Sequence, residues 1–388
     1  MAIIASHDLG WLICHKTYLN RMYNTCIDLT TEKRSEFCVS VLDSIFHIEN
    51  HFVMDSAARK LADKQSSSHT KKRKREEDIS DPLYNEIKDI LENSLDQLIK
   101  MGKECNYINE GFLSSTEIKN NNSEAKAVAK VLNKNFLLEF CNEKNSGKFD
   151  KLKESLSDIT TYPFDLPGIS LFLGKKYIIP DRTRFLLGDL SQIENLIKNT
   201  KNKFDVILMD PPWFNKSIKR KKSYHMLRNE DLLNIPIPQL ANSNCLVIVW
   251  VTNNQNQVHF IKEKLFPNWS VQYCADWHWI KITTHGSPVL PLHSHHKKPY
   301  ENLIIGRFKS SKSNTELPAI PNHKVIISIP SSIHSHKPPL TEVLKPYVRE
   351  DAECLELFAR YLIPGWTSCG NEVLKLQDLN LFEVSKLK

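Results

Sequence analysis

The stretch Phe204-Asp205-Val206-Ile207-Leu208-Met209-Asp210-Pro211-Pro212-Trp213 decides the fold of this chain. Its first six residues are mostly apolar and predict a buried β-strand, so the last four lie at the carboxyl end of that strand. Open α/β sheets bind their ligands just beyond the carboxyl ends of their strands. We therefore expect the functional site to lie around residues 210–213.

The tetrapeptide Asp210-Pro211-Pro212-Trp213 suits the recognition of an exocyclic amine on a nucleobase. The Asp210 carboxylate and the Pro211 carbonyl accept hydrogen bonds and carry no competing donor. The two prolines fix the backbone, and Trp213 offers a flat face on which a base can stack. A proline turn followed by a core tryptophan explains the same four residues equally well.

From about residue 160 onward, the apolar pattern alternates between strands and helices, which predicts an α/β fold with a largely parallel sheet. The predicted strands are 184–188, 204–209, 245–251, 271–281, 301–307, 324–329 and 354–359. The predicted helices are 190–198, 254–266 and 341–348. The strands 271–281 and 301–307 are joined by a polar loop and are expected to pair in antiparallel fashion.

Several separate segments resemble the N(6)-adenine methyltransferases that use S-adenosylmethionine, and within that family the nuclear methyltransferase-like branch. The segments, in chain order, are Asp210-Pro211-Pro212-Trp213 with Phe214-Asn215-Lys216-Ser217, Trp279-Ile280-Lys281, His296-Lys297-Lys298-Pro299-Tyr300-Glu301, Ser335-His336-Lys337-Pro338, Leu357-Phe358-Ala359-Arg360 and Trp366 to Glu372. The resemblance implies a circularly permuted (β-class) Rossmann-like core that methylates the 6-amino group of adenine in RNA. It further implies internal 2′-O-methyladenosine of small nuclear RNA as the target, with DNA adenine as the alternative.

The resemblance also implies residues for binding S-adenosylmethionine. Lys337 is similar to the lysine that meets the methionine carboxylate, and Arg360, Asn371 and Glu372 are similar to residues at the ribose. Glu372 replaces the glutamine of other members, but a carboxylate also accepts from both ribose hydroxyls. Asp189 resembles the acid beside the cofactor adenine, although Gly188-Asp189 is equally a simple turn. The sequence leaves open whether Asp210 serves the cofactor, the target base or both.

Candidate substrate-binding residues flank the tetrapeptide. Trp213 and Phe214 are candidates for stacking on the base, and the family suggests that Asn215 and Lys216 approach the base or its sugar. The basic residues that follow, including Lys219 and Arg220, fit a phosphate-binding loop, or else a lysine-rich surface loop. His296 and Lys297 are expected to line the nucleic-acid path, unless they form an ordinary polar loop.

Four regions are expected along the chain. Residues 1–63 form an N-terminal accessory region, and residues 64–80 form a disordered basic linker. Residues 81–150 form a helical accessory region with helices at 82–101 and 125–142, and residues 160–388 form the methyltransferase domain. The linker contains Lys71-Lys72-Arg73-Lys74-Arg75, which favours nuclear import. We expect the protein in the nucleus, with the cytoplasm as a second location.

Composition excludes several other classes of protein. The chain has 388 residues and a net charge of +7, with no apolar run of membrane-spanning length and no secretory leader pattern. Its nine cysteines are scattered, which indicates reduced thiols, and no metal site is expected because the histidines lack zinc spacing. The glycines form no dinucleotide fingerprint, and Gly168 to Lys175 fails as a phosphate-binding loop. Nothing in the sequence requires a protein partner.

Two other functions are compatible with the sequence. The chain resembles a family that contains catalytically silent partners, so it is alternatively a nucleic-acid-binding scaffold. Methylation of the 4-amino group of cytosine uses related chemistry and is a further alternative.

Overall fold

The computed structural model describes residues 2–30, 36–49, 51, 82–108, 159–172, 174–213, 227–294, 297–309 and 317–386. The predicted linker 64–80 and the predicted helix 125–142 lie outside the described residues. None of the helices in the described part of the chain is long and apolar enough to cross a bilayer.

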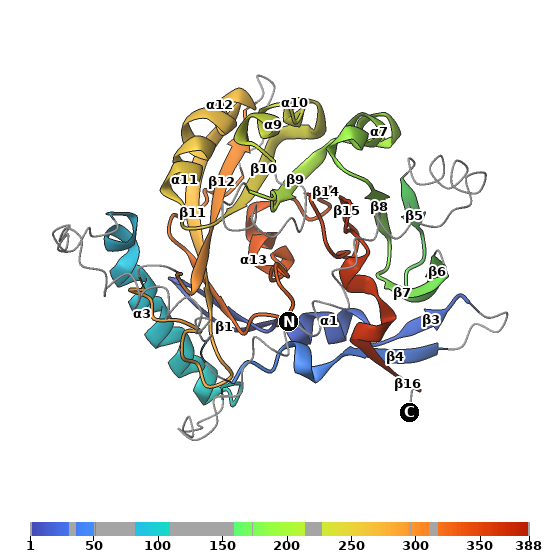
Figure 1. Cartoon of the computed structure of the whole chain (residues 1–388), viewed down its shortest axis with the longest axis horizontal. Helices are drawn as coiled ribbons and strands as arrows, with labels where there is room; N and C mark the ends of the chain where they lie inside the picture. Colours follow the sequence, from blue (N-terminus) through green and yellow to red (C-terminus); the bar gives the residue numbers. More distant parts are fainter. Residues whose placement is uncertain are drawn as a thin grey trace, which may run out of the picture.

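The described residues build one large sheet of eleven strands (Figure 1). In spatial order the strands are β1 (Ile3–His7), β2 (Gly10–Ile13), β13 (Val325–Ser328), β11 (Val271–Lys281), β12 (Tyr300–Phe308), β10 (Ala241–Val251), β9 (Phe204–Met209), β14 (Cys354–Leu357), β15 (Thr367–Gly370), β8 (Thr183–Leu187) and β5 (Thr160–Tyr162). Strands β10, β9, β14, β15 and β8 run parallel to one another. Their carboxyl ends therefore meet at one edge of the sheet.

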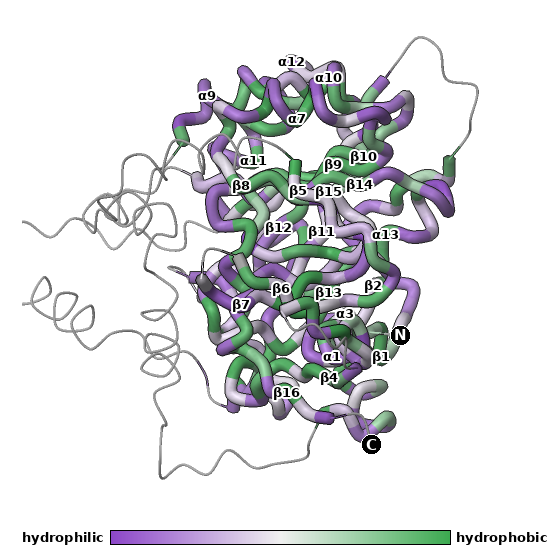
Figure 2. Tube along the Cα trace, turned by 90° about the vertical axis from the view of Figure 1, so that its right-hand side faces the viewer, coloured by the Kyte–Doolittle hydropathy of each residue, from purple (hydrophilic) through white to green (hydrophobic). Residues whose placement is uncertain are grey.

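Helices cover one face of this sheet, along the top of Figure 1. They are α7 (Ile193–Asn199), α9 (Asn229–Leu233), α10 (Ile237–Leu240), α11 (Gln255–Phe260), the π-helical turn η3 (Ile261–Leu265) and α12 (Phe266–Asn268). Figure 2 shows that the central strands β9 and β10 are largely hydrophobic. All six residues of β9 are buried, as is typical of a parallel strand that is covered on both faces.

A second, five-stranded sheet lies on the other side of the molecule. Its spatial order is β16 (Phe382–Lys386), β4 (Glu36–Val41), β3 (Cys26–Asp28), β6 (Gly168–Phe172) and β7 (Lys175–Ile179). Both ends of the described chain take part, because β16 pairs antiparallel with β4 (Figure 1). The glycine-containing segment that fails as a phosphate-binding loop forms the hairpin β6–β7.

Short helices complete the layer between the sheets. They are α1 (His15–Met22), η1 (Asp43–Ile45), α13 (Thr341–Leu344), η4 (Lys345–Tyr347), η5 (Lys375–Gln377) and η6 (Leu379–Leu381). The short helix η2 (Leu190–Gln192) directly precedes α7 and belongs to the helical face of the large sheet. The layer shares one core with the large sheet, including Leu19, Val39, Leu208 and Trp277.

Described residues near the N-terminus pair directly with strands from the region 160–388. Strand β2 pairs in parallel with β13, and β3 pairs in parallel with β6. Helix α3 (Pro82–Glu104) packs on β1, β2 and β13 through an apolar face that includes Ile87, Leu91 and Leu98. The physical reason is that short strands leave backbone groups unpaired unless another sheet edge accepts them.

All seven predicted strands are present, and β9 and β11 have the predicted bounds. The expected antiparallel pairing of 271–281 with 301–307 is confirmed as β11 with β12. The predicted helix 254–266 is divided into α11, η3 and α12, and the predicted helix 341–348 is divided into α13 and η4. Strand β14 ends at Leu357 rather than at residue 359, because Phe358 has a positive φ of 60°.

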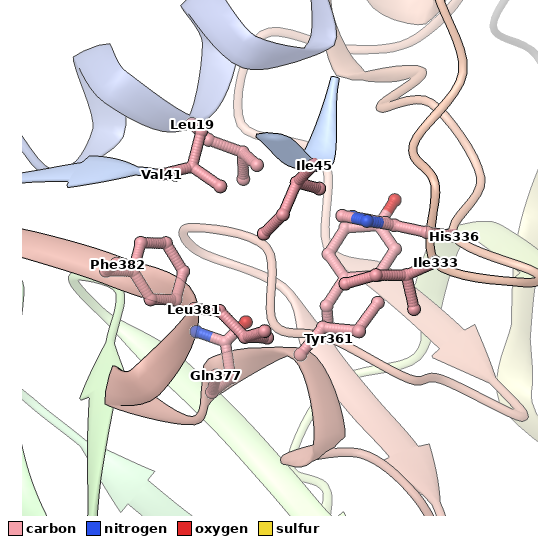
Figure 3. Close-up of a pocket in the computed structure, with 10 residues that line it drawn as sticks. Leu19, Val41, Ile45, Ile333, His336, Tyr361, Gln377, Leu381 and Phe382 are labelled. Carbon is pink, nitrogen blue, oxygen red and sulfur yellow. The ribbon is translucent and has the colours of Figure 1, made fainter. Parts of the chain in front are cut away.

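Four polar side chains are buried near the carboxyl ends of the parallel strands and in the layer of short helices. Glu356, Ser368, His336 and His15 are buried, and each has a side-chain polar atom with no hydrogen-bond partner among the described residues. His336 also lines a small apolar cavity beside Tyr361 and Gln377 (Figure 3). Burial and the repulsion of Asp210 raise the pKa of Glu356 to about 8, against the opposing effect of Arg360.

Leu12 joins the N-terminal strands to the core, because it is fully buried and contacts the segment around Gly102 at the end of α3. Leu12→Ala leaves a cavity there and is expected to lower the free energy of unfolding by about 2–5 kcal/mol. Urea denaturation of the full chain measures this loss. Leu171, which is 60% exposed, provides the control, since Leu171→Ala is expected to change stability by less than about 0.5 kcal/mol. Equal effects of the two changes would contradict the placement of β2.

The Glu356 carboxyl makes stability depend on pH. Its pKa rises from 4.5 to about 8 on folding, so the folded state binds more protons between these values and the free energy of unfolding falls as pH rises through this window. Glu356→Gln is neutral throughout, so the variant gains stability relative to the original chain by at most about 1.4 kcal/mol per pH unit. Urea denaturation across this window measures the difference, which is expected to level off above about pH 8. A difference that does not change with pH would contradict the assignment.

Candidate active site

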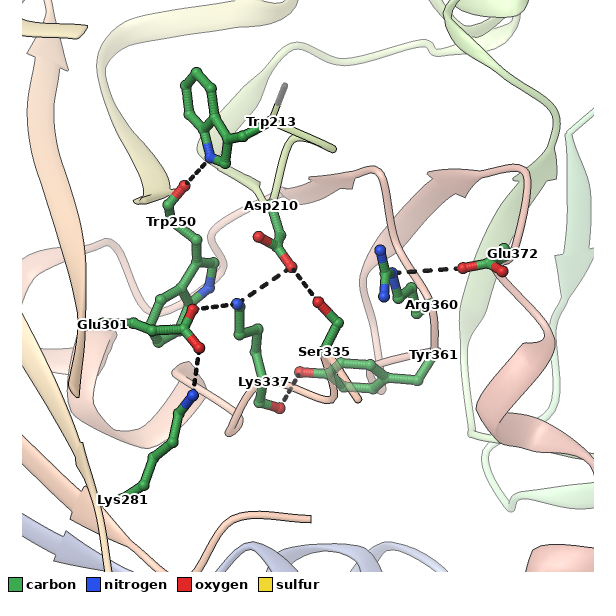
Figure 4. A network of polar contacts seen from close by, with 10 residues as sticks. All are labelled: Asp210, Trp213, Trp250, Lys281, Glu301, Ser335, Lys337, Arg360, Tyr361 and Glu372. Atoms are coloured by element: carbon green, nitrogen blue, oxygen red, sulfur yellow. Dashed lines mark hydrogen bonds and ion pairs between the residues drawn. The ribbon is translucent and has the colours of Figure 1, made fainter. Parts of the chain in front are cut away.

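The predicted site residues follow the carboxyl ends of four neighbouring parallel strands. Asp210 follows β9, Arg360 lies three residues after β14, Glu372 lies two residues after β15, and Asp189 lies two residues after β8. Lys337 reaches the same edge from the long connection that follows β13 (Figure 4). Parallel pairing of β14 with β9 and with β15 thus places residues from distant parts of the sequence side by side.

The Lys337 ammonium lies at the centre of a buried network of charges. Its Nζ atom is 2.5 Å from Glu301 Oε2 and 3.4 Å from Asp210 Oδ2, and the side chain is only 9% exposed. Burial disfavours the charged form, but the two carboxylates outweigh it, so the pKa of Lys337 is raised. Lys337 therefore keeps its positive charge inside the protein, which is the property needed to bind an anion there.

Glu301 is the site residue that the sequence analysis did not single out. It lies at the start of β12, whose antiparallel direction brings this end to the carboxyl edge of the neighbouring strands. Lys281 and Lys337 bind its two different oxygens (Figure 4). Burial would raise the pKa of Glu301, but the two lysines hold it well below its usual range. Glu301 is the last residue of the segment His296 to Glu301, which resembles the family. Buried charged residues are normally paired with an opposite charge, and this rule is the signal that could have identified Glu301.

Two backbone distortions shape the site. Ser335 has a φ of 65°, and its hydroxyl lies 3.5 Å from Asp210 Oδ2. Phe358 has a φ of 60° at the end of β14. Gly370 ends β15 beside this turn, and a Cβ atom there would lie 2.4 Å from the Ala359 carbonyl oxygen. Left-handed conformations of residues other than glycine are costly and cluster at functional sites.

Trp213 differs from the predicted open stacking surface. Its side chain is buried in the core on the helical face of the sheet, and its indole nitrogen donates to the Trp250 carbonyl at 2.9 Å. Figure 4 shows the indole turned towards this carbonyl. The Pro211 carbonyl accepts from the Trp213 amide at 2.8 Å and keeps its second lone pair for another donor. Tertiary packing thus makes Trp213 an anchor of the turn that presents Asp210.

The Glu372 carboxylate lies between two cations, Lys375 and Arg360. Lys375 Nζ is 2.7 Å from Glu372 Oε1, and Arg360 Nε is 3.5 Å from Glu372 Oε2. Glu372 remains partly exposed, so a ligand can reach its carboxylate. Asn371 and Asp189 are both exposed. Asp189 accepts the Ser191 amide at 2.8 Å and caps η2, which is the turn role that the sequence allowed for it.

Most of the predicted substrate-binding residues are not described. Phe214, Asn215, Lys216, Lys219, Arg220 and His296 lie outside the described residues. Lys297 is described and is exposed. Trp213 and Leu227, the described residues that flank positions 214–226, form a parallel bridge.

The described residues suit S-adenosylmethionine by their chemistry. Lys337 is a buried cation for a carboxylate, and Glu372 is an accessible acceptor for hydroxyl groups. Asp210 makes both of its contacts through Oδ2, which leaves Oδ1 without a partner among the described residues and free to accept from an amino group. The site therefore offers a cation for the carboxylate of this cofactor, an acceptor for its ribose, and in Asp210 an acceptor for an amino group of the cofactor or of the target base.

Comparison with known proteins also indicates a methyltransferase. The MT-A70 family model matches residues 204–372, which include Asp210, Glu301, Lys337 and Glu372. The N(6)-adenine-specific methyltransferase METTL4 of Homo sapiens is 52% identical over 216 residues, which cover 54% of this chain and 46% of that protein. The N6-methyladenosine RNA methyltransferase MTA1 of Pyricularia oryzae is 33% identical over 222 residues, covering 55% of this chain and 58% of that protein.

One relative matches nearly the full length. The DNA N6-methyl methyltransferase of Caenorhabditis elegans is 32% identical over 361 residues, which cover 89% of this chain and 93% of that protein. By contrast, this chain spans about half the length of the METTL4 relatives. The resemblance inferred from the sequence, including that to methyltransferase-like protein four, is confirmed. The chain therefore belongs to the MT-A70 family, whose methyltransferases depend on S-adenosylmethionine.

Proposed function

We propose that this chain transfers a methyl group from S-adenosylmethionine to the 6-amino group of adenine in RNA. The observation that carries the proposal is the contact of Lys337 with both Asp210 and Glu301 at the carboxyl edge of the sheet. This network couples an anion-binding cation directly to the acidic group of the Asp-Pro-Pro-Trp turn. Binding of the cofactor and activation of the amine then share one group of side chains.

Lys337 would hold the methionine carboxylate, and Glu301 keeps this lysine charged and in place. Glu372 would accept hydrogen bonds from the ribose, with Arg360 and Asn371 beside it. Asp189 remains the candidate for the cofactor adenine, since it lies at the next strand end of the same sheet edge. S-adenosylmethionine, when bound, supplies an electrophilic methyl group on its sulfonium sulfur.

Asp210 and the Pro211 carbonyl would together orient the target amine. An aromatic amine is a weak nucleophile because its lone pair is delocalised into the ring. Two fixed acceptors that take hydrogen bonds from the two N–H groups would free this pair for attack. As the new nitrogen–carbon bond forms, the bond between the methyl carbon and the sulfonium sulfur would break and release S-adenosylhomocysteine, and one N–H proton would pass to the Asp210 carboxylate and from there to solvent. The buried Trp213 contributes by fixing the turn, because its indole N–H is bonded to β10.

The substrate must present an unstacked adenine, because pairing in a duplex occupies the 6-amino group. RNA is supported by the relatives named N6-methyladenosine RNA methyltransferase, and internal 2′-O-methyladenosine of small nuclear RNA is our specific proposal. DNA is the second candidate, and one observation favours it: the relative that covers almost the whole chain is named a DNA methyltransferase.

The strand order supports a circularly permuted core. Strands β14 and β15, which precede the cofactor residues Arg360 and Glu372, come last in the chain among the strands of the large sheet, whereas β9 with Asp210 comes earlier but lies beside β14. We also propose that the protein acts in the nucleus, on the basis of Lys71 to Arg75, and that it acts without an obligatory protein partner. The intact charge network argues against a silent scaffold.

Asp210→Asn tests the catalytic assignment, because the amide keeps the shape of the side chain but removes one acceptor oxygen. Methyl transfer to adenine-containing RNA is expected to fall by about 10²–10³-fold, while the circular dichroism spectrum is unchanged. Mass spectrometry of nucleosides after incubation with labelled S-adenosylmethionine measures the product. The control is Asp165→Asn, since this carboxylate is 91% exposed.

The same measurement separates the alternatives. Matched RNA and DNA oligonucleotides, with and without a 2′-O-methyl group on the target adenosine, identify the preferred substrate. A product of N4-methylcytidine would overturn the adenine assignment, and an unchanged rate with Asp210→Asn would overturn the role of the turn.

A further inference from the structure

The Glu372 carboxylate is held by its two cations through different oxygens. Lys375 contacts Oε1 at 2.7 Å, whereas Arg360 Nε lies 3.5 Å from Oε2. The lysine contact is therefore the close one, and the arginine contact is long for a hydrogen bond. This asymmetry fixes one oxygen of the carboxylate and leaves the other more accessible to a hydroxyl donor.

Lys375 is positioned by backbone contacts on both sides. Its amide donates to the Glu372 carbonyl at 2.8 Å, and the amide of the next residue, Leu376, donates to the Arg360 carbonyl at 3.1 Å. The short helix η5 is thus tied both to the end of β15 and to the segment after β14. These two hydrogen bonds connect the backbone around Lys375 to the backbone of Glu372 and of Arg360.

Gln377 anchors the other end of η5 in the core. Its Nε2 atom donates to the Tyr23 hydroxyl at 2.7 Å and to the Ile178 carbonyl at 2.6 Å, and its Oε1 atom accepts the Leu362 amide at 3.2 Å. The side chain is buried beside Phe382 and Leu381 (Figure 3). Both amide donors and the acceptor are satisfied, so η5 has a fixed place against the N-terminal segment and β7.

The ion pair of Lys375 with Glu372 differs from an ordinary surface ion pair of the same protein. Lys198 and Glu194 on α7 are 3.9 Å apart, and their side chains are 72% and 80% exposed. Lys375 and Glu372 are 13% and 23% exposed. Exposed ion pairs contribute little to stability because solvent screens them. A partly buried lysine with a fixed backbone loses less conformational entropy when it binds its partner.

We propose that Lys375 is a positioning residue that orients the Glu372 carboxylate for the ribose hydroxyls of S-adenosylmethionine. The inference rests on the proposed function, because it assumes that Glu372 faces the cofactor. In the absence of Lys375 the carboxylate is drawn to Arg360, and it must then break that ion pair before it accepts from the ribose. Lys375 thus favours the binding-competent orientation without touching the cofactor.

A double-mutant cycle tests this role. The four proteins are the original chain, Lys375→Met, Glu372→Gln and the double variant, and calorimetry measures the dissociation constants of S-adenosylmethionine and S-adenosylhomocysteine. Glu372→Gln is expected to weaken binding about tenfold, and Lys375→Met about three- to tenfold. The double variant is expected to bind no more weakly than Glu372→Gln, because Lys375 acts through Glu372.

Kinetics and a matched control distinguish positioning from general destabilisation. Lys375→Met is expected to raise KM for the cofactor and leave kcat unchanged, and Lys375→Arg is expected to restore part of the affinity. Lys198→Met removes the exposed lysine of α7 and is expected to change neither constant. Urea denaturation verifies that each variant is folded.

The inference is overturned if Lys375→Met weakens binding equally with Glu372 and with Gln at position 372, or if it lowers kcat alone. It is also overturned if neither single change affects cofactor binding. In each of these cases the methyl-transfer reaction of the original chain with saturating cofactor still tests the proposed function separately.

Discussion

The buried ammonium of Lys337 is the constraint on which the rest of the site depends. A charge inside a protein is tolerated only when other groups neutralise it. Glu301 does so from the start of β12 and Asp210 from the end of β9, with distances of 2.5 and 3.4 Å. The sheet must therefore bring an antiparallel strand and parallel strands to one edge, and the spatial order β12-β10-β9-β14 does this.

The support behind this edge comes from the two ends of the described chain. Tyr361 donates to the Lys337 carbonyl at 3.4 Å and lies beside His336, while His336 packs edge-on against His15 of α1 with 4.3 Å between ring centroids. Gln377 connects η5 to Tyr23 in the same layer. The N-terminal segment and the C-terminal segment thus hold the connections that carry Lys337 and Glu372.

The sequence predicted most of the strands that carry the site because they are rich in apolar residues, in a nearly continuous run in β9 and interrupted by polar residues in β11. It missed β15, although Glu372 follows this strand, because Thr367-Ser368-Cys369-Gly370 has a polar pattern and becomes a buried strand through its pairing with β14 and β8. It likewise missed β3 and β4, whose partners are β6 and β16 far along the chain. Long-range pairing, rather than local preference, decides such strands. For the same reason the sequence could not decide between a stacking and a core role for Trp213, and it did not predict the role of Glu301.

Asp210, Lys337 and Glu372 come from three segments that are far apart in the sequence, and our account depends on their sharing one ligand. A crystal structure of the chain with S-adenosylhomocysteine tests this directly. We expect the amino-acid carboxylate of the ligand at Lys337, its ribose hydroxyls at Glu372 and its sulfur near Asp210. Density for the ligand at a site that contacts neither Lys337 nor Glu372 would contradict the account.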